Sequence, residues 1–177
     1  MSAENMTKKI EESGLAASSE KPEKKSLEEL KKTVEADIDQ FIVRMELAEN
    51  PKDLKDEEGV RHFPAFGSSE GGFARVYENE GQLYFKVAAS VMEMPADKEL
   101  ILPLMRELLT INVFFPTFGR LGIMDKRVYA TMTYPVELMN REDVGRTIYS
   151  VFSLADSVDD RLKKKYGGTT KKRAGKK

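Results

Sequence analysis

The sequence contains no cysteine and a single histidine, His62, among its 177 residues. Without cysteine the chain can form no disulfide and has no thiol nucleophile, which is compatible with a cytoplasmic protein. With one histidine, metal sites and catalytic pairs that need two histidines are excluded. Because His62 stands beside aromatic residues, we expect it to be structural or exposed rather than catalytic.

Long apolar runs are also missing. No stretch approaches the roughly 18 consecutive apolar residues that a membrane-spanning helix needs. The first residues, MSAENMTKKIEES, contain no apolar segment followed by a cleavage site of small residues, so we expect no signal peptide. These absences favour a cytoplasmic location.

Motifs for phosphate binding and nucleophilic catalysis are absent as well. The sequence contains no P-loop, no dinucleotide-binding glycine pattern and no G-x-S-x-G. The glycine-rich run at 67–72 lacks a following Lys-Ser or Lys-Thr, so we interpret it as a flexible loop. Asp156, Asp159 and Asp160 could hold a hard cation such as Mg²⁺, but we favour a solvated acidic face. We therefore predict no enzyme, no catalytic residue, no cofactor and no metal site.

Charge is unevenly distributed along the chain. Residues 163–177 carry eight lysines and arginines and no acid, whereas residues 1–25 carry five acids and five lysines. Because the whole chain has a formal net charge of −1, the body at 26–162 must carry −9. The sequence therefore predicts an acidic body with a basic tail.

We expect a single α+β domain at 26–166, between disordered tails at 1–25 and 167–177. The first tail is rich in Ser, Glu, Lys and Ala and cannot bury enough apolar area to become ordered. The second tail could bind nucleic acid, because clustered cations release counterions from phosphates. Its candidate residues are Lys171, Lys172, Arg173, Lys176 and Lys177. A solvated tail is an equal alternative, and an anionic membrane surface is a weaker third use.

Residues 26–50 have the pattern of an amphipathic helix. Ser26 and Glu29 form a capping box, and apolar residues then recur at spacings of three and four. The helix should end near Asn50, because the following Pro51 disfavours a helical conformation at the residue before it.

Two β-hairpins are indicated by β-branched and aromatic residues around turn residues. They are Phe73–Met92 and Thr117–Tyr134, the second with Asp125 at its turn. Val60–Phe66 could add a short edge strand, which Pro64 limits because proline cannot donate a ladder hydrogen bond.

A helix follows each hairpin. The first covers roughly Asp97–Asn112, with Asn112 closing it, and the second covers Arg141–Tyr166 after Asn140, a good N-cap. Pro103 fits if the true helix begins just before it, since proline is tolerated in the first turn. The fold class is thus α+β: an antiparallel sheet of four or five strands with three helices, in the order αβ(β)βαββα.

This arrangement resembles the type III secretion chaperone-like fold, and most closely the YbjN family within it. The resemblance covers about Ser26–Lys165. It is carried by LMRELLTIN at 104–112, FGRLGI at 118–123, Asp125 at the turn, the strand at 128–134, and VFSLAD at 151–156. The resemblance implies a small dimer-forming protein that binds other polypeptides without catalysis.

We therefore predict a non-catalytic protein-binding module, chaperone-like or adaptor-like, that forms a homodimer. A partner segment would bind on the sheet face or in an apolar groove, by strand addition or through side-chain pockets. Methionines suit a surface that adapts to varied partners, although filling of the core is the plainer interpretation. The candidate partner-binding residues are Phe73, Val76, Leu83, Phe85, Met92 and Met132. The alternative is a nucleic-acid-associated accessory protein that uses the basic tail.

Overall fold

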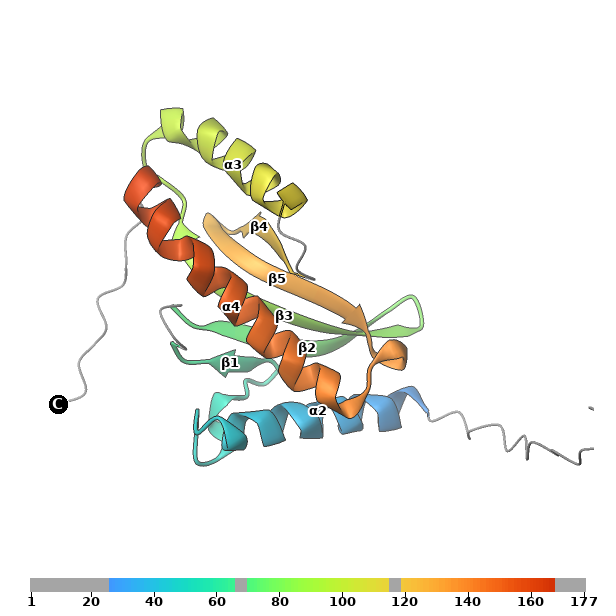
Figure 1. Cartoon of the computed structure of the whole chain (residues 1–177). Coiled ribbons are helices and arrows are strands. Elements are labelled where there is room, and N and C mark those ends of the chain that lie inside the picture. The colour runs from blue at the N-terminus through green and yellow to red at the C-terminus, as the bar shows by residue number, and fades with distance from the viewer. Residues whose placement is uncertain (1–25, 66–69, 115–118, 168–177) are drawn as a thin grey trace, which may run out of the picture.

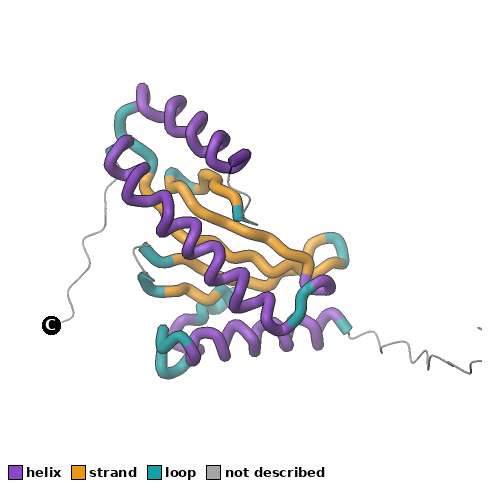
Figure 2. Tube along the Cα trace, in the orientation of Figure 1, coloured by secondary structure: helices purple, strands orange, loops and turns teal. Residues whose placement is uncertain are grey.

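The described residues of the computed structural model form three long helices and five strands (Figures 1 and 2). The structure describes residues 26–65, 70–114 and 119–167, so the predicted tails and their basic residues lie outside it, apart from Gly167. The helices are α2 (Leu27–Arg44), α3 (Ile101–Phe114) and α4 (Arg141–Tyr166). The strands are β1 (Arg61–Phe63), β2 (Gly72–Asn79), β3 (Gln82–Glu93), β4 (Arg120–Met124) and β5 (Arg127–Pro135).

The strands form one antiparallel sheet in the order β1-β2-β3-β5-β4. Both predicted hairpins are confirmed. Each turns on two residues with positive φ, Glu80 and Gly81 in the first and Asp125 and Lys126 in the second. Such turns twist in the same sense as the strands they join. The possible strand at 60–66 is present as β1, at the edge of the sheet beside β2.

Helix α2 begins as the sequence predicts. The Ser26 hydroxyl accepts from the N–H of Glu29 at 3.2 Å, and the Glu29 carboxylate accepts from the N–H of Ser26 at 2.9 Å. The predicted end near Asn50 is wrong, because the helix stops at Arg44. Glu46 has a left-handed φ of 54°, and Glu46 and Leu47 donate their N–H groups back into the last turn. This C-terminal motif satisfies the final carbonyls before the proline is reached.

Helix α3 also departs from its predicted ends. A short 3₁₀ turn, Lys98–Leu100, precedes it, so Pro103 lies in the first helical turn as expected. The helix continues to Phe114, so Asn112 does not close it. Instead the Asn112 side chain forms two hydrogen bonds with the backbone of Leu121 in β4. Asn112 therefore connects the helix to the edge of the sheet.

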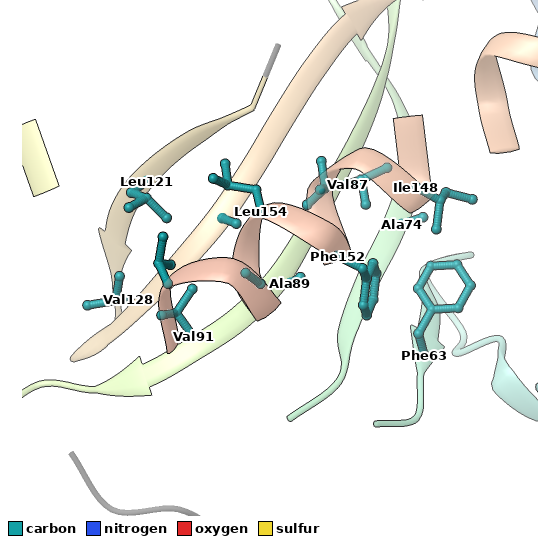
Figure 3. Close-up of a cluster of buried hydrophobic side chains, with 14 of the residues drawn as sticks. Phe63, Ala74, Val87, Ala89, Val91, Leu121, Val128, Ile148, Phe152 and Leu154 are labelled. Atoms are coloured by element: carbon teal, nitrogen blue, oxygen red, sulfur yellow. The ribbon is translucent and has the colours of Figure 1, made fainter. Parts of the chain in front are cut away.

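Helix α4 has the predicted bounds, and Gly167 ends it with a φ of 73°. It crosses the sheet, with α2 beside it, so that both helices cover one face (Figure 1). Phe63 and Phe152 meet edge to face at 5.6 Å within this core (Figure 3). The apolar sides of α2, α3 and α4 all join the same buried cluster. Among the described residues, therefore, the opposite face of the sheet, here called the outer face, carries no helix.

A buried ionic network fixes the end of α4 to the sheet. Asp159 is completely buried, and its carboxylate lies 3.1 Å from Nζ of Lys163. Lys163 also lies 3.4 Å from Glu70, whose other oxygen contacts Arg127. The predicted solvated acidic face is therefore wrong at Asp159, whereas the two neighbouring aspartates of that prediction are exposed. The sequence does not show this burial, because Glu70 and Arg127, which complete the network around Lys163, are distant from α4 in the chain.

Candidate binding surfaces

Helix α3 is apolar on two sides. Leu104, Leu108 and Ile111 are buried in the core. On the other side, four side chains spaced three or four residues apart form what we call the α3 stripe. They are Leu102, Met105, Leu109 and Val113, with exposed fractions of 56%, 42%, 65% and 78%. Contiguous apolar patches of this kind on a small protein mark interaction sites.

The strand beside α3 is an open edge of the sheet. Among the described residues β4 pairs only with β5, so its other side has no strand partner. Ile123 and Met124 at its end are 43% and 36% exposed. An unpaired strand edge offers N–H and C=O groups to another chain, although those of Leu121 in β4 are already bonded to the Asn112 side chain. The α3 stripe and this edge thus lie on one side of the molecule, as α3 packs on β4 (Figure 1).

An open groove of about 730 Å³ separates α3 from the end of α4. At its wall, Glu107 accepts hydrogen bonds from Lys165 and from the Tyr166 hydroxyl, the latter at 2.6 Å. These bonds, the one from Lys165 above all, lower the pKa of Glu107. Arg161 lies 3.5 Å from the same carboxylate. The groove is therefore closed at one side by an ionic contact between two helices.

The outer face of the sheet is lined by aromatic and cationic side chains. In the register of β2 and β3, Phe73 faces Ala88 and Tyr77 faces Tyr84. The rings of Tyr77 and Tyr84 stack, with centroids 5.7 Å apart. Phe73 contacts Tyr129 of β5 edge to face at 6.4 Å. Because side chains alternate along a strand, all of these residues point away from the helices.

Two cations lie between these aromatic pairs. Arg75 of β2 is directly opposite Lys86 of β3. The Arg75 guanidinium lies over the Tyr77 ring, 4.8 Å from its centroid. Like charges directly opposite on neighbouring strands destabilise a sheet, so their presence here requires an explanation.

Most of the predicted partner-binding residues lie in the core or on the inner side of the sheet, and not on an exposed surface. Leu83, Phe85 and Met92 are buried in the core, with exposed fractions of 2%, 0% and 0%. Val76 and Met132 pack against the same core from the inner side of the sheet. In this conformation the three buried side chains cannot contact a partner, and we drop them from the binding surface.

Phe73 is the one predicted partner-binding residue that lies on the outer face. The sequence prediction missed its neighbours Arg75, Tyr77, Tyr84 and Lys86. The signal was present in β3, where Leu83, Phe85, Val87 and Ala89 alternate with Tyr84, Lys86, Ala88 and Ser90. Both series include apolar residues. Periodicity alone therefore does not say which of the two series faces the helices.

The described part of the chain offers no cluster of side chains for metal binding. Within it, no group of three His, Cys, Asp or Glu side chains could hold a metal ion. His62 is 60% exposed and lies 2.7 Å from Asp56, and their hydrogen bond lowers the pKa of that carboxyl. None of the described helices is both long enough and apolar enough to cross a membrane.

Comparisons with known proteins find similarity in structure alone. No family model matches the chain, and no curated protein matches it. A chain of the ExsC–ExsE complex matches with a TM-score of 0.56 and 17% identity, over 75% of this chain and 96% of that chain. A chain of the HopA1–SchA chaperone–effector complex matches with a TM-score of 0.52 and 11% identity, over 77% and 99%. YbjN from E. coli matches with a TM-score of 0.44 and 14% identity, over 71% and 90%.

The first two similarities confirm the fold predicted from the sequence. The part of the chain that the structure describes has the α+β fold of the secretion chaperones, with three long helices and a five-stranded antiparallel sheet.

Proposed function

We propose that this protein is a non-catalytic, chaperone-like module that binds another polypeptide, and that it acts in the cytoplasm as a homodimer. The fold is shared with a chain found in a chaperone–effector complex, which supports a role in binding polypeptides. The observation that carries the homodimer is the α3 stripe, a continuous apolar surface on a helix whose opposite side already belongs to the core.

A second copy of this chain is the occupant that suits the α3 stripe. The 14-residue helix is about 20 Å long, and the stripe runs from its first turn to its last. In a twofold dimer both protomers use the same surface patch. The apolar stripe of one protomer would then pack on the apolar stripe of the other, and no unpaired charge would be buried between them. Burying Leu109 and Val113, at 65% and 78% exposure, would remove the two most exposed side chains of the stripe from water.

The outer face of the sheet does not belong to this dimer surface. The α3 stripe lies on a helix that packs on β4, the strand at one edge of the sheet, whereas the cations of the outer face lie on β2 and β3. A homodimer formed through α3 therefore leaves Arg75, Tyr77 and Lys86 available to a partner polypeptide.

The dimer is tested by mass in solution. The wild-type chain is expected at twice the 20.0-kDa chain mass by native mass spectrometry and sedimentation. Leu109→Glu places a charge in the centre of the stripe and is expected to give a monomer. Val43→Glu is the matched control, because Val43 is 54% exposed on α2, outside the stripe. A wild-type monomer at every concentration measured, or equal dimerisation of both variants, would contradict this part of the proposal.

Polypeptide binding is tested separately. The full chain, isolated from its own cells under native conditions, is expected to carry one polypeptide in a fixed stoichiometry. A dimer that never carries a polypeptide, even after chemical cross-linking in the cells, would refute the chaperone-like role while leaving the dimer intact.

A further inference from the structure

The outer face of the sheet is cationic at its centre. Arg75 and Lys86 face each other across β2 and β3. The five strands contain only two acidic residues, Glu78 and Glu93. Glu93 pairs with Arg127 at 2.6 Å. Glu78 belongs to the alternate set of β2 residues, which includes the completely buried Ala74 and points to the other side of the sheet. Among the described residues neither Arg75 nor Lys86 forms an ion pair with an acid.

The Arg75 side chain is held in place with hydrogen-bonding capacity unused. Its guanidinium lies 4.8 Å above one side of the Tyr77 ring, and Tyr84 stacks on that ring as well. The Nε atom of Arg75 is buried and has no hydrogen-bond partner among the described residues. Because Nε is covered, a carboxylate would meet the other nitrogens of the guanidinium. The contact with the Tyr77 ring holds that group on the outer face before a carboxylate arrives.

We propose that the outer face binds an extended, acidic segment of the partner polypeptide, with a carboxylate held between Arg75 and Lys86. This inference rests on the proposed function and names the chemistry of the bound segment. Neighbouring strands are about 4.8 Å apart, so one carboxylate can reach both cations. Binding would also remove the unfavourable interaction between the two like charges. Phe73 and Tyr129 on one side, and Tyr77 and Tyr84 on the other, supply apolar contacts for the flanking residues of the segment.

A single-stranded nucleic acid fits this face less well. Bases stack on aromatic rings whose faces are free. The Tyr77 ring already contacts both Arg75 and Tyr84, and Phe73 is engaged edge to face with Tyr129. The body at 26–162 carries a net charge of −9, which repels a long polyanion more strongly than a short acidic segment.

The test measures binding of a defined probe to the full-length protein by fluorescence anisotropy. The probe is a labelled peptide of about eight residues with alternating Glu and Thr, which matches the length of an ordinary strand. We expect salt-dependent binding. The double variant Arg75→Gln/Lys86→Gln is expected to weaken it by at least about tenfold, since both charge-assisted hydrogen bonds are lost. Lys98→Gln is the matched control, because Lys98 is exposed in the 3₁₀ turn before α3 and lies outside the sheet. It is expected to bind as wild type.

Three results would overturn the inference. They are no binding of the Glu-Thr peptide, equal binding by the double and control variants, and tighter binding of an oligothymidylate of the same length through Arg75 and Lys86. Circular dichroism of each variant establishes that the fold is kept, and the single variant Lys86→Gln serves if the double variant does not fold. The dimer is tested separately, by mass in solution and with Leu109→Glu. A wild-type chain that is monomeric but still binds the peptide through Arg75 and Lys86 would refute the dimer and retain this inference.

Discussion

Asn112 of α3 satisfies both backbone groups of Leu121 in β4. Its Nδ2 donates to the Leu121 carbonyl at 2.9 Å, and its Oδ1 accepts from the Leu121 N–H at 2.7 Å. The side-chain amide thereby takes the place that one residue of a neighbouring strand would occupy. This contact fixes the helix that carries the α3 stripe against the edge strand of the sheet.

Asn112→Ala is expected to destabilise the fold by about 2 kcal/mol, because it leaves two backbone groups in a partly buried site without partners. The free energy of unfolding from urea denaturation measures the effect. Thr110→Ala is the control, since the Thr110 hydroxyl only bonds to the Arg106 carbonyl within the same helix. Equal stability of the two variants would show that the contact between helix and strand contributes little.

Gly72→Ala is expected to be strongly destabilising. A Cβ atom at Gly72 would lie 2.2 Å from the Ala88 carbonyl oxygen and 2.9 Å from the Phe152 ring, so backbone must move. We expect a loss of about 3 kcal/mol or more. Gly122→Ala, also in a strand, has nothing within 4 Å of its added Cβ and should be neutral or slightly stabilising. Thermal unfolding followed by circular dichroism distinguishes them, and similar melting temperatures would disprove the steric argument.

Asp159→Ala is expected to cost about 1–3 kcal/mol, because it removes a completely buried carboxylate from Lys163, which keeps Glu70 as its anionic partner. Asp160→Ala is the matched control at the next position, where the side chain is exposed, and should cost well under about 1 kcal/mol. The comparison is made by urea denaturation at neutral pH. A small effect at both positions would mean that the ionic network is not coupled to folding.

Glu107 is expected to make stability depend on pH in acid. Its pKa is lowered from 4.5 by the hydrogen bonds from Lys165 and Tyr166. A carboxyl whose folded pKa is lowered stabilises the fold fully above its unfolded pKa and loses that stabilisation as pH falls through the folded pKa. Wild type should therefore be more stable than Glu107→Gln at neutral pH, and the difference should vanish well below pH 4.5. Melting temperatures of both proteins across this range test it, and a constant difference would argue against the titration of Glu107.

Much of the fold follows from sequence patterns that involve residues only a few positions apart. The Ser26 cap, the Asp125 turn and the bounds of α4 depend on residues within a few positions of one another, and the structure confirms each. The predicted end of α2 is too far along the chain, because the prediction relied on Pro51 as the helix terminator. The left-handed residue that actually ends the helix is Glu46, and no glycine marks that conformation in the sequence. Asn112 was misjudged for a related reason, since its partner in β4 lies beyond the helix.

The candidate binding surfaces follow from the sequence far less completely. Alternation in β2 and β3 is visible in the sequence, but the side of the sheet covered by helices is decided by packing between distant segments. That packing buried Leu83 and Phe85 and left Arg75 and Lys86 on the outer face. Likewise, α3 is apolar on two sides in the sequence, and only its contact with β4 decides which side joins the core and which becomes the α3 stripe.

The sequence by itself determined the order of helices and strands, their turns and most of their ends, because these depend on propensities, caps and periodicity within a few residues. The tertiary structure alone decided which face of the sheet is open, which side of α3 is exposed, and that Lys163, beside the buried Asp159, meets Glu70. Those features depend on contacts between residues that are far apart in the chain and close in space.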